Sequence, residues 1–321
     1  MTIPRLVTLL ILASLAATSA FAFDLPDNSL WLAEGRVRTQ GAALQVPAEM
    51  LQATNVNTLQ AVGKALVVWT VQQRDADSKI LSFELHLADV ERGTDRLLLK
   101  GVDPFGQGPE WWLQRVQLSK SGKALLVRIR LSGSGGFVEV HKLLLDGSGA
   151  HYPVPEGTPV WSDISADGST QVMPTWGLTA DAPHLADNQR KFGSLIVADT
   201  HHPQGRWLWK IAHYADIPQW AGYEIESPAL SPDGKQIAYA CAAGLWVVPV
   251  AGGTPRLVVP MPTADIVVDD LVWARDGSGV YFTGVRYADP GAREMISYVP
   301  LKGGLAWTVR GDAGRLCLPR L

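Results

Sequence analysis

Two stretches of the sequence combine aromatic, arginine and acidic side chains in a way that suits binding. Tryptophan, tyrosine and arginine dominate the anchoring positions of protein–protein interfaces. We therefore expect these stretches to contact a protein or peptide partner, the alternative being long loops that are merely solvated. The candidate binding residues are Trp176, Asp181, His184 and Arg190 in residues 175–193, and Arg286, Tyr287 and Arg293 in residues 284–294.

The sequence shows no catalytic or metal-binding constellation. Asp163–Gly168 matches the front half of a calcium loop, but Pro174 stands where a bidentate glutamate is needed. The adjacent pair His201–His202 would point two ways in a turn, and Glu84–His86 and Glu139–His141 repeat one pattern at the same place in two repeats. We expect no catalytic residue, no metal ion and no cofactor, although loops distant in sequence can still assemble an acid and a base.

The first 22 residues have the composition of a secretory signal peptide. Arg5 is the only early charge, an apolar run follows at residues 6–17, and Ala20-Phe21-Ala22 forms a small-x-small cleavage site. This run is short for a membrane span, so we expect an exported, soluble mature chain of residues 23–321 with no membrane insertion.

The composition of the chain argues against nucleic acid as a partner and against a disulfide bond. The formal net charge of −3 includes no basic block that could follow a phosphate backbone, so nucleic acid is not an expected partner. The two cysteines, Cys241 and Cys317, lie inside apolar runs. We expect two buried free thiols there rather than a disulfide.

A unit of turns and strands recurs along the chain. Its clearest copy is LSPDGKQIAYACAAGLWVVPVAGGTPRLVV, with a tight turn ending at Gly234. The turn glycine recurs at Gly63, Gly122, Gly168 and Gly277, and each is followed by a strand and then a hairpin. The pattern predicts five copies of a four-stranded antiparallel unit between residues 61 and 309.

Such a unit cannot bury both of its twisted faces alone, so the copies must pack face to face, which favours a β-propeller. No window keeps apolar residues at helical spacing. We predict a single all-β domain at residues 23–321, a propeller of about six four-stranded blades, with five as the alternative. Residues 28–46, as third and fourth strands, would join residues 311–321, as an inner strand, to close the ring.

The repeat resembles that of a known family. Ser231-Pro232-Asp233-Gly234, followed by KQIAYA and LWVVPVAGGTPRLV, is similar to the repeat of TolB-like β-propellers and of the propellers of the prolyl oligopeptidase group. The chain leaves no room for the α/β domain that precedes the TolB propeller, and it has no Gly-x-Ser-x-Gly elbow of a serine hydrolase. The resemblance implies a propeller that stands alone.

In the predicted propeller the loops that carry the candidate binding residues lie on one face. The loops between second and third strands and those between blades share one face, around the channel mouth, where a rigid scaffold can present binding residues. Trp111 and Trp112 follow the inter-blade stretch at residues 101–110, and Trp220 lies in the one at residues 213–224. Of the adjacent pair, we expect one ring to face the core and the other to cap the channel mouth.

TolB-like propellers act as periplasmic interaction platforms, and this resemblance implies a similar role here. We predict a periplasmic, monomeric scaffold in the cell envelope that binds an envelope protein or peptide. The alternative is a carbohydrate- or peptide-binding propeller, or a lyase or hydrolase, with its site at the channel mouth. In that case Trp111, Trp112, Trp176 and Trp220 would stack on sugar rings.

Overall fold

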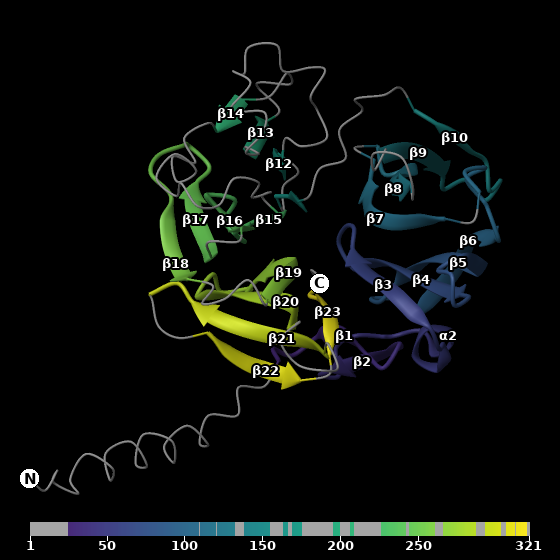
Figure 1. The fold of residues 1–321 in the computed structure, drawn as a ribbon, viewed down its shortest axis with the longest axis horizontal. Helices are drawn as coiled ribbons and strands as arrows, with labels where there is room; N and C mark the ends of the chain where they lie inside the picture. Colours follow the sequence, from purple (N-terminus) through teal and green to yellow (C-terminus); the bar gives the residue numbers. More distant parts are fainter. Residues whose placement is uncertain are drawn as a thin grey trace, which may run out of the picture.

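The protein is a β-propeller, as the repeats predict. In the computed structural model nearly all secondary structure is β-strand, and the sheets stand around a common centre (Figure 1). No helix in the described part of the chain is long and apolar enough to cross a membrane. The structure describes residues 25–108, 110–119, 121–131, 138–154, 163–165, 169–174, 195–199, 206–208, 226–241, 244–260, 266–286, 293–302, 306–311 and 313–319.

Five sheets, blades 1 to 5, have four strands each, which follow one another in chain order across the blade. Blade 1 contains β3 (Val56–Ala61), β4 (Leu66–Arg74), β5 (Ile80–Asp89) and β6 (Thr94–Gly101). Blade 2 contains β7 (Trp111–Leu118), β8 (Ala124–Leu131), β9 (Val138–Leu144) and β10 (His151–Pro153). Blade 3 contains β11 (Asp163–Ile164), β12 (Thr170–Pro174), β13 (Leu195–Asp199) and β14 (Arg206–Leu208).

The remaining two blades complete most of the ring. Blade 4 contains β15 (Glu226–Leu230), β16 (Gln236–Cys241), β17 (Gly244–Pro249) and β18 (Arg256–Pro260). Blade 5 contains β19 (Ile266–Trp273), β20 (Gly279–Arg286), β21 (Arg293–Pro300) and β22 (Trp307–Gly311). All strand pairs within these blades are antiparallel, so successive connections alternate between the two faces of the propeller.

A three-stranded closing sheet joins the two ends of the described chain. In it β23 (Gly314–Cys317) pairs with β1 (Ser29–Ala33), and β1 pairs with β2 (Arg36–Gln40). Closure by both ends is therefore confirmed, and the described residues form five four-stranded blades plus this sheet. The expected strand positions were wrong, because β23 lies near the centre and pairs directly with β1, which makes β1 and β2 the second and third strands. Residues 41–55 then return to blade 1 through the short helix α2 (Ala48–Gln52).

The repeated tight turn has a local physical cause. At Ser231 the backbone N–H donates to Gln236 O and the hydroxyl accepts from Gln236 N–H, at 2.9 Å each, while Gly234 adopts a φ of +68°. Gly122 and Gly277 adopt the same left-handed conformation, with φ of +68° and +70°. Gly63 does not, because in blade 1 the positive φ falls on Ala65 instead, and Gly168 lies outside the described residues.

Apolar side chains fill the spaces between neighbouring sheets. Alternate residues of a strand point to opposite faces, so each strand contributes to two such layers. One layer between the closing sheet and blade 1 includes Met50 and Trp69, and the next, between blades 1 and 2, includes Phe83 and Trp111. Both cysteines are free thiols as expected; Cys317 is buried, but Cys241 is only half-buried.

Candidate functional site

Most of the sequence-predicted site residues lie outside the described part of the chain. This holds for Trp176, Asp181, His184, Arg190, Trp220 and Tyr287. Arg286 ends β20 and Arg293 begins β21, and the two stand opposite each other in the antiparallel ladder. Both ends of the predicted loop at residues 284–294 are therefore strand, and residues 287–292 lie outside the described part of the chain. A binding role for these residues stays a prediction.

Trp111 and Trp112 begin β7, and as expected one ring of the pair faces the core. The Trp111 ring is fully buried and packs edge-on against Phe83 and Phe105, with ring centroids 4.8 and 4.9 Å apart. The Trp112 side chain points to the opposite side of the strand and is 41% exposed. Of the pair, only Trp112 therefore offers its indole to a partner.

Arg74, at the end of β4, holds Trp112 in place from the neighbouring blade. Its guanidinium carbon lies 4.9 Å from the centre of the Trp112 ring, which is a cation–π contact. The same guanidinium donates hydrogen bonds to the carbonyls of Ser78 and Trp111. Burial lowers the pKa of Arg74, but an arginine remains charged at neutral pH. The cation and the indole are thus fixed before any partner arrives.

The connection from blade 1 to blade 2 is also fixed by its own side chains. The Asp103 carboxylate accepts hydrogen bonds from the backbone N–H groups of Gln107 and Gly108, at 2.8 and 2.7 Å. Phe105 is buried and packs against Trp111. The loop that leads to Trp112 is therefore anchored by a cap and a buried ring, which restrains its conformation.

Further exposed side chains lie at the same end of blades 1 and 2. Leu81, near the start of β5, is 55% exposed, and Val102, just after β6, is 52% exposed. Arg130 is exposed and stands directly opposite Trp112 in the β7–β8 ladder. Because the strands are antiparallel, these positions all belong to the face of the propeller at which β4, β6 and β8 end. We call this the loop face, and the loop-face rim is the set Arg74, Leu81, Val102, Trp112 and Arg130.

Sequence reasoning found Trp112 but missed the rest of the rim. Arg74 and Trp112 are far apart in the chain, and no spacing rule links the end of one blade to the start of the next. Leu81 lies where the β4–β5 register shifts by a bulge, and such irregularities displace a side chain from its expected side. Arg130 is the exception: once the structure pairs it with Trp112, its side chain must lie on the same face of the sheet as that of Trp112.

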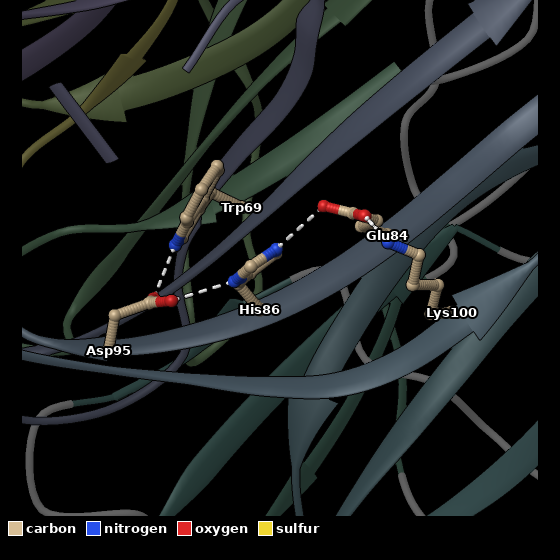
Figure 2. A network of polar contacts seen from close by, with 5 residues as sticks. All are labelled: Trp69, Glu84, His86, Asp95 and Lys100. Carbon is tan, nitrogen blue, oxygen red and sulfur yellow. Dashed lines mark hydrogen bonds and ion pairs between the residues drawn. The ribbon is translucent and has the colours of Figure 1, made fainter. Parts of the chain in front are cut away.

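A second polar arrangement lies within blade 1, where Figure 2 shows a chain of contacts across β4, β5 and β6. His86 Nδ1 is 2.7 Å from an Asp95 carboxylate oxygen, and the other Asp95 oxygen accepts a hydrogen bond of 2.8 Å from the Trp69 indole. His86 Nε2 is 3.4 Å from Glu84, which Lys100 contacts at 2.6 Å. The rings of Trp69 and His86 stack with centroids 4.0 Å apart.

This network uses both nitrogens of His86, so it holds three strands together rather than aiming the imidazole at a substrate. The hydrogen bond from Lys100 holds the pKa of Glu84 below its usual range, since it stabilises the ionised carboxylate. His86 and Asp95 are nearly buried in the layer between blade 1 and the closing sheet, beside Trp69. A satisfied buried network of this kind favours one strand register.

Blade 2 repeats the pattern with one change. His141 Nε2 is 3.2 Å from Glu139, as His86 is paired with Glu84. Asp95 in blade 1 pairs with the residue two positions after His86, and His151 in blade 2 pairs with the residue two positions after His141, so His151 takes the place of Asp95. The ring centres of His141 and His151 are 6.0 Å apart. Burial lowers the pKa of His141, and the nearby His151 acts in the same direction. The predicted repeat of Glu-x-His is therefore a repeat in space as well.

Among the described residues no three histidine, cysteine, aspartate or glutamate side chains gather as metal ligands would. No model of a protein family matches the chain, and no curated protein resembles it in sequence.

Solved structures do resemble the chain. A protein of Agrobacterium tumefaciens provisionally assigned as TolB matches with a TM-score of 0.45 and 13% identity, over 78% of this chain and 83% of that one. The chain is similar in fold to TolB. A prolyl endopeptidase matches with a TM-score of 0.42 and 14% identity, over 80% of this chain and 42% of its own length. An oligogalacturonate lyase solved with manganese matches with a TM-score of 0.39 and 15% identity, over 80% of this chain and 72% of that one.

These identities concern the fold alone. The TolB-like resemblance of the repeats is confirmed at that level. Nothing about partner, substrate or compartment follows from it.

Proposed function

We propose that this propeller is an exported scaffold of the cell envelope, working in the periplasm, and that it binds a protein partner through the loop-face rim. The observation that supports this most directly is Trp112, an exposed indole held by the guanidinium of Arg74 at 4.9 Å. Tryptophan and arginine are the residue types that most often carry the energy of protein interfaces. Here Arg74 is fixed by two backbone carbonyls and Trp112 by its contact with Arg74, which reduces the ordering cost of binding.

The shape of the rim also favours a macromolecule over a small ligand. Leu81 and Val102 are each more than half exposed, so the rim presents apolar as well as cationic side chains to solvent. Small molecules and sugars are usually held in concave sites that cover most of their surface. Trp111 has no part in the proposed surface, because its ring is buried between blades 1 and 2.

The compartment belongs to the same proposal and rests on the sequence of residues 1–22. Fractionation of cells that express the full chain with a C-terminal tag tests it. Recovery of a processed protein in the periplasmic fraction is expected. Recovery of the unprocessed chain in the cytoplasm would contradict export.

The partner is tested by cross-linking in intact cells, followed by purification of the tagged protein and mass spectrometry. The wild-type chain and the variants Trp112→Ala and Arg74→Ala are compared. Tyr152→Ala is a matched control, because Tyr152 is 42% exposed and carries a cation, Lys142, 5.6 Å from its ring, but lies on a different strand, β10.

We expect an envelope protein that is captured by the wild type and by Tyr152→Ala and is at least about tenfold depleted with Trp112→Ala, as loss of an interface anchor predicts. Equal capture by all variants would remove the rim from the interface. Failure of the wild type to capture any envelope protein would contradict the scaffold role.

A further inference from the structure

Phe105 anchors the connection from blade 1 to blade 2, and two of its ring neighbours are histidines. The centre of its buried ring lies 4.9 Å from that of His141 and 5.8 Å from that of His151. Its other ring neighbours, Phe83 and Trp111, do not titrate. The packing of this connection therefore depends on two side chains of the type that changes charge between about pH 5 and pH 8.

The neutral form of His141 suits its buried position. Its Nε2 lies 3.2 Å from Glu139, and because a carboxylate at neutral pH only accepts hydrogen bonds, Nε2 carries the proton. The other nitrogen, Nδ1, is buried and has no hydrogen-bond partner among the described residues. Such a position costs least when that nitrogen bears no proton and the ring bears no charge.

A second proton on His141 would upset this arrangement. It would bind at Nδ1 and create a buried N–H group that belongs to a cation and lacks an acceptor, which is far more costly than a buried neutral group. His151, with its ring centre 6.0 Å away, offers a second positive charge in acid rather than an acceptor. The imidazolium is then favoured where Nδ1 reaches water, away from Phe105.

Blade 1 shows the arrangement that accepts such a proton. His86 Nδ1 lies 2.7 Å from Asp95 and Nε2 lies 3.4 Å from Glu84, so each N–H group of an imidazolium would meet a carboxylate. Blade 2 keeps the glutamate, as Glu139, but has His151 at the position of Asp95. The two blades thus differ at the residue that decides whether a charged histidine can stay in place.

The surroundings of His141 do not offset the charge. Burial lowers its pKa, His151 acts in the same direction, and Glu139 opposes the shift. β8 places the apolar Val127 opposite His141, so its arginines lie on the other face of the blade. The charged groups of β6, β9 and the connection have partners elsewhere, namely Asp95 with His86, Lys100 with Glu84, Arg96 with the carbonyl of Leu145, Lys142 with the ring of Tyr152, and Asp103 with amides of the connection itself.

We propose that His141 and His151 form a pH-sensitive switch, which holds the connection from blade 1 to blade 2 closed at neutral pH and releases it in acid. The closed form binds the proton on His141 more weakly than the open form does. Closure is therefore fully favoured above the ordinary histidine pKa of about 6.5 and weakens as the pH falls below it.

Release of the connection would also loosen the loop-face rim. Phe105 packs against the ring of Trp111, and the carbonyl of Trp111 accepts a hydrogen bond from Arg74, which holds Trp112. An open connection removes the first of these supports. Acid should thus weaken binding at the rim; this consequence rests on the proposed function, whereas the opening itself does not.

Hydrogen exchange of the mature protein tests the opening. The amides of Gln107 and Gly108 are protected by their hydrogen bonds to Asp103, so their exchange reports local release of the connection. Protection factors, corrected for the intrinsic effect of pH on exchange, are compared at about pH 7.5 and about pH 5.5. We expect these two amides to lose protection at least about tenfold in acid, while the amides of β5 stay protected.

Three variants assign the effect to the two histidines. His151→Asp rebuilds the arrangement of blade 1, and His141→Phe keeps a ring against Phe105 that does not titrate. Protection should be independent of pH in both. His86→Gln is the matched control in blade 1, and it should lose protection in acid as the wild type does.

The consequence for binding is tested by cross-linking the tagged wild type and His151→Asp in cells held at the same two pH values. Capture of the envelope partner should fall in acid for the wild type and stay constant for His151→Asp. If the wild type captures no partner at neutral pH, the proposed scaffold role fails, while hydrogen exchange still tests the switch.

Four results would overturn the switch or its effect on the rim. The first is equal protection of Gln107 and Gly108 at both pH values in the wild type. The second is the same loss in His151→Asp as in the wild type, and the third is an equal loss in β5, which would show global unfolding. The fourth is capture of a partner that does not change with pH, which would separate the connection from the rim.

Discussion

The Arg275 guanidinium donates a hydrogen bond to the backbone carbonyl of Pro319 across 3.0 Å. The same side chain also donates to the carbonyl of Asn28, at 3.0 Å, and to that of Asp27. Arg275 lies in the turn between β19 and β20, so one residue of blade 5 binds both the segment that leads into β1 and the segment that follows β23. The closure of the ring thus depends on a side chain as well as on strand pairing.

The first prediction concerns this clamp. Arg275→Ala should lower the free energy of unfolding by about 2 kcal/mol, because hydrogen bonds to a charged group are lost and the carbonyls must find water instead. Urea denaturation followed by tryptophan fluorescence measures the change. Arg256→Ala is the control, since Arg256 donates to a single carbonyl, that of Leu301, at 2.9 Å. Equal losses in the two variants would show that Arg275 has no special part in closure.

The second prediction concerns the repeated turn. Gly234→Val should destabilise the protein by at least about 1 kcal/mol, because a β-branched residue is strained at positive φ. Crowding is not the cause, since a Cβ at this position would meet Ser165 at an ordinary 3.6 Å. Thermal unfolding measures the effect, with Gly63→Ala as the control in a turn whose glycine does not have positive φ. An unchanged melting temperature for Gly234→Val would contradict the turn assignment.

The third prediction concerns pH and His141. Burial lowers its pKa in the folded protein, so as the pH falls the unfolded chain binds a proton first. The contribution of neutral His141 to the free energy of unfolding is fully present above the ordinary histidine pKa of about 6.5. As the pH falls below that value, the free energy of unfolding decreases by at most about 1.4 kcal/mol per pH unit.

Denaturation of the wild type and of His141→Gln from about pH 7.5 to about pH 5.5 measures this dependence. The variant should show the weaker dependence on pH. Two neighbours affect the size of the difference: Glu139 favours the charged imidazole, whereas His151 opposes it. Parallel curves for the two proteins would show that His141 does not titrate differently on folding.

Much of the fold followed from the sequence because its determinants are local. The Ser231–Gly234 turn is made by hydrogen bonds that span only a few residues, and the strands that follow show the alternation that a two-sided sheet requires. Repetition of this unit then forces face-to-face packing. The signal that the two ends of the chain meet was also present in the strand-like stretches at residues 28–46 and 311–321.

The sequence by itself determined the propeller and its repeated turn, since these depend on patterns within one blade, and it indicated closure by both ends through the strand-like stretches there. The tertiary structure alone decided which side chains meet between blades. Arg275 and Asp27 are 248 residues apart, and Arg74 contacts Trp111 across 37 residues. It also decided that the closing sheet has three strands, because α2 takes up the chain that a fourth strand would have needed. Contacts of this kind depend on how the blades are stacked, and no spacing along the chain encodes them.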